Sequence, residues 1–311
     1  MTSSAAWAPF LNAAELSMFL TLVEAEVRDL GVPYRLGEGI VEVDLEDGTQ
    51  SLGLSNLAQV CAAQPAAGWP DAVRKHFQLV IGSTREEIEL RSFAHDFERV
   101  RAMLRVRLYE ACHPDQLMRP IGEGLAAGVV FDLASAMRNL TREEAAVWDR
   151  TDAEVFDCAL ANLALEEPDQ ARTIRGPEEV PIVVVEGTSY YTASRALLLE
   201  REVVPEGHPY GALVIVPSRH VFFYHLIEDS RVIVAVNALV SLAIEAYKRG
   251  PGSISDSVFW IRPDGLASND SEKSESRFVP IPWELQNGTL YVTPPPQFVK
   301  DVLERVAQPP S

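Results

Sequence analysis

The chain has 311 residues, of which 47% are hydrophobic and 23% charged, and it carries a formal net charge of −18. This composition is ordinary for a globular protein, and the length suggests about two domains. So acidic a surface repels phosphate backbones and anionic bilayers, which argues against a nucleic-acid partner and against membrane docking. The arginines between residues 99 and 107 stand among acidic residues, so we interpret them as mixed surface charge.

Cysteine use and apolar run lengths predict a cytoplasmic protein. Cys61, Cys112 and Cys158 are far apart and show no metal-ligand spacing, which suits thiols in a reducing compartment. The longest nearly uncharged apolar run, residues 232–244, is shorter than the ~20 residues that a membrane-spanning helix needs. The N-terminal residues lack the basic-then-apolar layout of a signal peptide.

Residues 1–100 are predicted to form a small α+β module. A helix is expected from Asn12, where the spacing of apolar residues is helical and the order Asn-Ala-Ala-Glu resembles a capping box. Residues 40–54 alternate apolar and acidic side chains around Asp47-Gly48, which predicts a hairpin. Helices over 56–63 and 70–80 follow, and a further charged helix is expected over 83–104.

Residues 101–266 are predicted to form a larger α+β domain with a mostly antiparallel sheet. Thr151 and Glu154 are spaced as a capping box and open a helix, whereas the polar stretch 166–177 is predicted to be a connection. A helix is also expected up to Arg249, where Gly250-Pro251 stops it. Strands are expected at residues 105–109, 125–133, 180–186, 189–192, 212–217, 221–227 and 257–262.

Residues 267–311 are predicted to form a separate C-terminal segment. Its start is rich in Ser, Glu and Lys and is typical of a flexible connector. Asn287-Gly288 then predicts a hairpin, and a short amphipathic helix is expected after Pro294-Pro295-Pro296.

Four short pieces in order resemble the YtpQ-like family of uncharacterised bacterial proteins over residues 102–265. They are Arg105-Val-Arg-Leu-Tyr109, Ala159-Leu-Ala-Asn162-Leu163, Tyr191-Thr-Ala-Ser194-Arg195 and Val216-Pro-Ser-Arg219. The family pattern carries Asp after the last arginine, where this chain has His220. The resemblance implies a soluble bacterial α+β protein, and it implies no reaction, cofactor or ligand.

Two arginines at predicted corners are candidate anion-binding residues. Arg195 and Arg219 each stand beside a strongly apolar strand, and a guanidinium there can bind a carboxylate or phosphate through its planar fork. Tyr191, with its neighbour Tyr190, would line such a site. The same arginines could instead brace the corners by bonding backbone carbonyls or a local carboxylate.

Glu42, Asp44 and Glu46 fall on one face of a predicted strand. Their carboxylates could hold Mg²⁺ or Ca²⁺, because hard cations prefer oxygen ligands. The ordinary alternative is the solvated outer face of a hairpin.

The sequence carries no Gly-x-Ser-x-Gly elbow and no glycine-rich phosphate loop. We therefore expect a non-enzymatic binding or adaptor protein without a cofactor that acts through protein–protein contact, its acidic surface favouring a basic partner. The alternatives are an enzyme or binder of a small anionic ligand at the Arg195 and Arg219 corners, and a divalent-metal protein. The sequence leaves the oligomeric state open.

Overall fold

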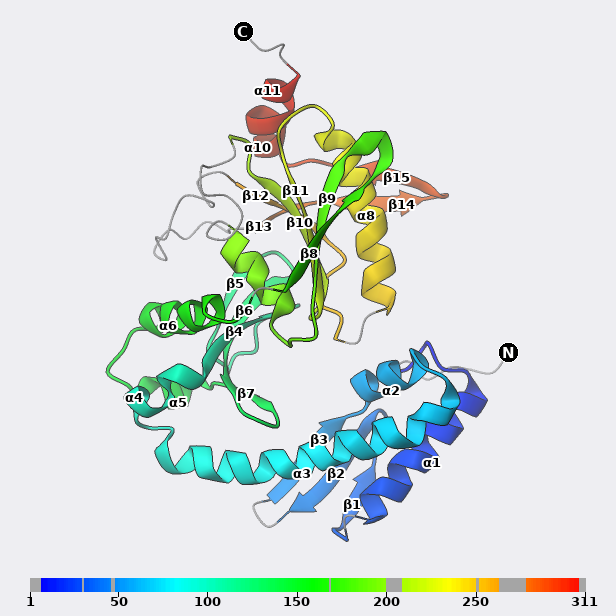
Figure 1. The fold of residues 1–311 in the computed structure, drawn as a ribbon, viewed down its shortest axis with the longest axis vertical. Helices are drawn as coiled ribbons and strands as arrows, with labels where there is room; N and C mark the ends of the chain where they lie inside the picture. Colours follow the sequence, from blue (N-terminus) through cyan, green and yellow to red (C-terminus); the bar gives the residue numbers. More distant parts are fainter. Residues whose placement is uncertain are drawn as a thin grey trace. The chain divides into compact units, whose positions relative to one another are not determined.

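A computed structural model describes residues 7–29, 31–45, 48–167, 169–199, 209–249, 252–262 and 278–307. The chain divides into two compact units, Met1–Ser92 with Leu133–Ala136 and Phe93–Asp132 with Met137–Ser311. Both units combine helices with antiparallel sheets, so the fold is α+β as predicted (Figure 1). The sequence predicted a boundary at residue 100, whereas the structure divides the chain after Ser92.

The N-terminal unit packs helices against a sheet of three antiparallel strands. Val41 and Val43 lie on the inner face of the central strand, where they join Phe19 and Phe77 in one buried cluster. This explains the alternation in the sequence, because every second side chain of a strand points to the same face. The elements in chain order are α1 (Ala13–Asp29), β1 (Tyr34–Leu36), β2 (Ile40–Leu45), β3 (Gly48–Gly53), α2 (Ser55–Ala62), η1 (Ala66–Gly68) and α3 (Trp69–Phe93).

The C-terminal unit begins with a sheet of four strands built around β6, in which seven of the eight residues are buried. Strand β6 pairs with β4, β5 and β7, all antiparallel. Helix α6 starts at the predicted capping box of Thr151 and Glu154 and contacts β4 and β6. The elements are α4 (Phe97–Val100), η2 (Arg101–Met103), β4 (Leu104–Tyr109), β5 (Met118–Gly122), β6 (Leu125–Asp132), β7 (Met137–Asn139), α5 (Arg142–Ala146) and α6 (Asp152–Ala164).

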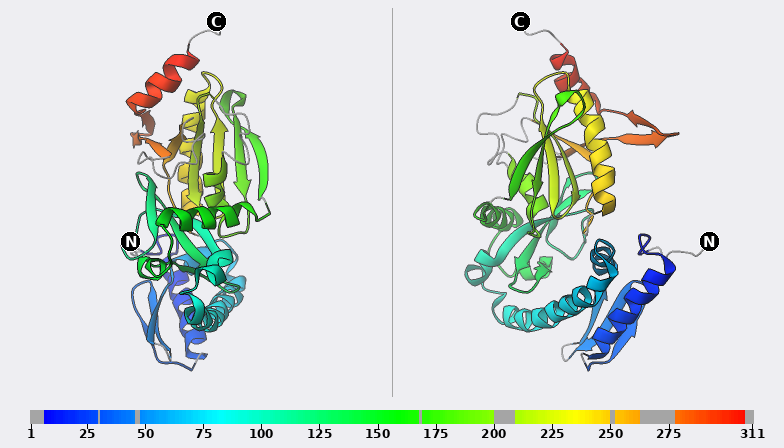
Figure 2. Two further views of the ribbon diagram at one scale, coloured as in Figure 1. Left: turned by 90° about the vertical axis from the view of Figure 1, so that its left-hand side faces the viewer. Right: turned by 45° about the vertical axis from the view of Figure 1, so that its right-hand side comes forward.

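A second sheet of six antiparallel strands follows, in the order β13-β12-β10-β11-β9-β8. Helix α8 runs along one face of this sheet in both views of Figure 2. The elements are β8 (Gln170–Arg175), η3 (Pro177–Glu179), β9 (Pro181–Glu186), η4 (Thr192–Leu198), β10 (Ala212–Ser218), β11 (Val221–Leu226), α8 (Val232–Arg249), β12 (Val258–Ile261), β13 (Phe278–Ile281), β14 (Trp283–Gln286), β15 (Thr289–Val292), α10 (Pro296–Phe298), the π-helical turn η5 (Val299–Leu303) and α11 (Glu304–Val306).

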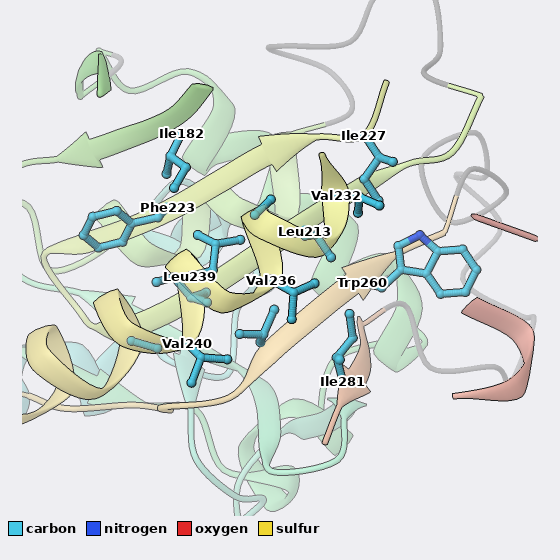
Figure 3. Close-up of a cluster of buried hydrophobic side chains, with 14 of the residues drawn as sticks. Ile182, Leu213, Phe223, Ile227, Val232, Val236, Leu239, Val240, Trp260 and Ile281 are labelled. Atoms are coloured by element: carbon cyan, nitrogen blue, oxygen red, sulfur yellow. The ribbon is translucent and has the colours of Figure 1, made fainter. Parts of the chain in front are cut away.

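The main core of this unit lies between the six-stranded sheet and α8 (Figure 3). Leu213, Phe223 and Trp260 of the strands belong to the same buried cluster as Val236 and Leu239 of the helix. The 3-10 helix η4 contacts β9, β10 and β11 as well as β4. It therefore links the two sheets of the unit.

Three expectations about individual elements differ from the structure. Helix α3 is one helix of 25 residues, where two were predicted over 70–80 and 83–104. The predicted connection 166–177 contains β8, which pairs with β9. Residues 189–192 form a turn that runs into η4, so the predicted strand pair around Gly187 was wrong.

The C-terminal residues belong to the second unit. Strand β13 extends the six-stranded sheet by pairing with β12, whereas β14 and β15 form the predicted hairpin. The predicted connector at 267–277 lies outside the described residues. Among the helices that the structure describes, none is long and apolar enough to cross a bilayer.

Candidate functional site

The turn between β10 and β11 carries Arg219 and His220, and backbone hydrogen bonds fix it from three sides. The Arg219 amide donates to the carbonyl of Gly252 at 3.0 Å, and the Arg219 carbonyl accepts from the Ala193 amide at 3.1 Å. The His220 carbonyl accepts from the Gly187 amide, also at 3.1 Å. Because segments far apart in the sequence meet here, the turn is held rigidly.

The side chains of this turn define the protonation state of His220. Arg219 Nε donates to His220 Nε2 at 2.9 Å, and His220 Nδ1 lies 3.1 Å from the carbonyl oxygen of Ser189. A guanidinium is only a donor, so Nε2 must hold a lone pair and Nδ1 must carry the proton. His220 is therefore neutral here. Burial, followed by the charge of Arg219, lowers its pKa below the ordinary 6.5.

Tyr190 forms an aromatic wall beside the same turn. The guanidinium carbon of Arg219 lies 4.8 Å from the centre of the Tyr190 ring. The ring centres of Tyr190 and His220 are 5.8 Å apart. Since Tyr190 is 46% exposed, this side of the arginine is next to solvent.

Arg107 brings a second guanidinium to this turn from the four-stranded sheet. Leu104, Val106 and Leu108 of β4 are buried on one face, which leaves Arg107 and Tyr109 on the other. Burial, and then the charge of Arg107, lower the pKa of Arg219 below its ordinary value. Arg107 also lowers the pKa of His220. The positive charges of the two arginines therefore repel each other.

The partners of Arg107 are neutral. Its Nη1 donates to the sulfur of Met137 at 3.0 Å, and its guanidinium carbon lies 5.1 Å from the Tyr109 ring centre. The buried Nε atom has no hydrogen-bond partner in the described part of the chain. Thioethers are weak acceptors, so none of these contacts neutralises the charge.

Among the described residues, no carboxylate oxygen lies within 4.0 Å of a guanidinium nitrogen of Arg107 or Arg219. The neighbouring Arg105 shows what a compensated arginine looks like here. Its Nε donates to Glu166 at 2.6 Å, and its Nη2 lies 4.0 Å from Asp132. Nearby carboxylates therefore compensate the charge of Arg105. No carboxylate among the described residues compensates the charges of Arg107 and Arg219 in this way.

Two of the predicted anion-binding residues have other partners. Arg195 is 4% exposed, and its Nη1 donates toward the carbonyl of Leu163 on α6 at 3.5 Å. The Tyr191 hydroxyl donates to Asp132 at 2.8 Å, and burial together with this carboxylate raises the pKa of Tyr191. The arginine that acts on Arg219 electrostatically is Arg107, and the tyrosine against it is Tyr190.

Sequence reasoning treated Arg107 as part of a mixed surface charge. That interpretation fits Arg101, which is 58% exposed and pairs with Glu98 at 3.2 Å. The signal for Arg107 was the alternation along β4, which placed it on the same strand face as Arg105 and Tyr109. Its approach to Arg219 depends on the packing of two sheets, and no local pattern records that.

The predicted carboxylate ladder of β2 is paired with an arginine. Arg35 Nε lies 3.0 Å from Glu42, and its Nη2 lies 3.7 Å from Asp44. Thr49 also donates to Asp44 at 2.7 Å. Glu46 lies outside the described residues. Over the described ranges, no group of three or more His, Cys, Asp or Glu side chains could hold a metal ion.

Three buried or half-buried histidines predict acid sensitivity. Burial lowers the pKa of His76, His220 and His225 below 6.5. The folded protein then binds fewer protons than the unfolded chain, so the free energy of unfolding decreases as pH falls below about 6.5. Each unit by which a pKa is lowered contributes about 1.4 kcal/mol.

Urea unfolding at pH 7.5 and pH 5.5 checks this expectation. The second unit holds His220 and His225 whereas the first holds His76, so we expect the larger loss in the second. A midpoint that is equal at both pH values would contradict the expected acid sensitivity.

Comparison of the chain with known protein families, with curated proteins and with solved structures found no match. The resemblance to the YtpQ-like family therefore stays a prediction. What the chain can do chemically rests on the geometry around Arg107 and Arg219.

Proposed function

We propose that the C-terminal unit binds a small anionic ligand through Arg107 and Arg219. The observation that carries this proposal is that neither guanidinium has a carboxylate partner among the described residues, where the buried Nε of Arg107 also has no hydrogen-bond partner. The charge of Arg107 in addition lowers the pKa of Arg219. Like charges brought together and partly buried cost stability. A bound anion would offset that cost.

The donor geometry supports the same proposal. Arg219 Nε donates a hydrogen bond to His220, whereas the two terminal nitrogens of Arg219 have no hydrogen bond to the described residues. A guanidinium presents these nitrogens as a fork that matches carboxylate and phosphate oxygens. The partly exposed ring of Tyr190 lies against the same guanidinium, which gives a ligand a wall to contact.

The test is anion binding to Arg219→Gln and Arg107→Gln, measured by titration calorimetry with sulfate and with inorganic phosphate. A charge-assisted hydrogen bond contributes ~1.5–3 kcal/mol, so each substitution should weaken binding about 10-fold or more. Removing one of two repelling charges should leave the thermal midpoint equal or higher.

Arg305→Gln is the matched control. Arg305 lies on α11, is 58% exposed and pairs with Asp301 at 3.4 Å, so its loss changes the net charge equally and leaves the proposed site intact. Sulfate should bind this variant as it binds the unmodified protein. The proposal fails if Arg219→Gln binds sulfate as well as Arg305→Gln, or if the unmodified protein binds neither anion.

Protein–protein contact, the first expectation from the sequence, stays a prediction. The large apolar side chains that are most exposed lie on different elements, so they do not indicate one apolar surface for a protein partner. Among the described residues they include Val147, Leu165, Ile233, Leu285 and Tyr291. The unpaired arginines support the anion proposal more directly.

A further inference from the structure

We infer that His220 is a positioning residue for Arg219 and that its proton sets the affinity of the site for anions. This inference rests on the proposed anion site. It starts from one geometric fact, namely that Arg219 Nε donates to His220 Nε2 at 2.9 Å. The contact needs an unprotonated Nε2, because two donors cannot share one hydrogen bond.

A proton on Nε2 of His220 makes the contact with Arg219 repulsive. The imidazolium would present N–H to the N–H of Arg219, and two cations would face each other at hydrogen-bonding distance. The other ring nitrogen gives no relief, because Nδ1 already donates to the Ser189 carbonyl at 3.1 Å. Arg219 must then leave His220, so the position of the guanidinium depends on the protonation of the ring.

The charged groups around His220 come from several elements. Arg219 is its neighbour in the turn, and Tyr190 packs against the ring with centres 5.8 Å apart. Arg107 of β4 disfavours the imidazolium, whereas Asp169, before β8, favours it. The cations act on the ring more strongly than Asp169 does, and the free site therefore holds His220 neutral at pH 7.

A bound anion reverses this balance. It screens the ring from the positive charges of Arg219 and Arg107, and this screening favours the imidazolium. By linkage, an anion that favours the protonated ring must bind more tightly when the ring is protonated.

Sulfate is the probe, because it is a dianion at every pH tested and its own titration cannot mimic the effect. The sulfate dissociation constant should decrease about 5-fold or more between pH 8 and pH 5.5, the lower range of measured couplings between two sites. Calorimetry at pH 6 in two buffers of different ionisation enthalpy should show proton uptake on binding.

His220→Gln separates this mechanism from general effects of acid. The glutamine side chain offers Arg219 an acceptor and does not titrate, so the ratio of dissociation constants between pH 8 and pH 5.5 should fall toward 1. His113→Gln is the control, because His113 is 58% exposed and lies outside the site. It should keep the ratio of the unmodified protein.

The outcomes distinguish the two proposals. Loss of sulfate binding in Arg219→Gln, together with equal pH ratios in His220→Gln and the unmodified protein, would overturn the role of His220 and leave the anion site standing. Absence of proton uptake by the unmodified protein at pH 6 would overturn the role of His220 even if the glutamine variant did not fold.

Discussion

Gly211→Ala should destabilise the C-terminal unit by about 2–5 kcal/mol, the sum of a left-handed alanine and an overpacked contact. Gly211 has a φ of +78°, a conformation that residues with a Cβ rarely adopt. A Cβ there would also collide with the backbone carbonyl oxygen of Ile261. That oxygen belongs to β12 and cannot swing aside as a side chain would.

The neighbouring strands leave Gly211 little freedom to move. Ala212 pairs with Ile261 on one side and with Leu226 on the other, and the Gly211 carbonyl accepts from the Ile227 amide at 3.0 Å. Moving Gly211 therefore disturbs three central strands together. Urea unfolding followed by circular dichroism measures the loss.

Gly124→Ala is the matched control for this change. Gly124 has a φ of +70°, and a Cβ at this position would meet no atom within 4 Å. Gly124→Ala should lower the free energy of unfolding by about 1–2 kcal/mol, because only the left-handed backbone conformation is unfavourable there. Equal losses in the two variants would mean that the collision with Ile261 contributes nothing.

Trp260→Ala should lower the free energy of unfolding by about 3–5 kcal/mol, the range for truncating a fully buried large aromatic side chain. Trp260 is 1% exposed on β12 and belongs to the core between the sheet and α8 (Figure 3). Its Nε1 donates to the Tyr210 carbonyl at 2.9 Å, and its ring meets Phe298 edge-on with centres 5.2 Å apart. The substitution removes these contacts and leaves a cavity.

Because Phe298 lies on α10, the same substitution should also loosen the C-terminal helical segment. We expect faster hydrogen exchange over residues 296–307 in Trp260→Ala than in the unmodified protein. Trp260→Phe retains an aromatic ring without the N–H, so it should cost less and keep that segment protected. Unchanged exchange in the alanine variant would show that Phe298 does not depend on Trp260.

Elements with a strong local signal could be predicted from the sequence. The hairpin of β2 and β3 follows from alternation, β6 follows from an unbroken apolar run, and α6 follows from its capping box. Strand β8 could not be found in this way, because five of its six residues are exposed and it is held by backbone pairing to β9. A strand held by backbone bonds shows little side-chain pattern.

The candidate site could be predicted only in part for a similar reason. The corner at Arg219 is local, since it is the turn of one hairpin. Arg107 lies on another sheet, and its charge acts on Arg219 because the two sheets are joined by η4 and by the contact of β5 with β13. Whether a charged side chain is compensated depends on such long-range packing, which one sequence does not reveal.

The strand order also has a consequence for synthesis. The outer side of β12 is covered by β13, whose residues come after Trp260 in the chain by more than a dozen positions. While the ribosome has not yet released Phe278–Ile281, the buried residues Phe259 and Trp260 belong to a strand with unpaired amide and carbonyl groups on one side. Such an open edge can pair with another chain, so a nascent polypeptide that stalls before residue 278 would expose a template for aggregation.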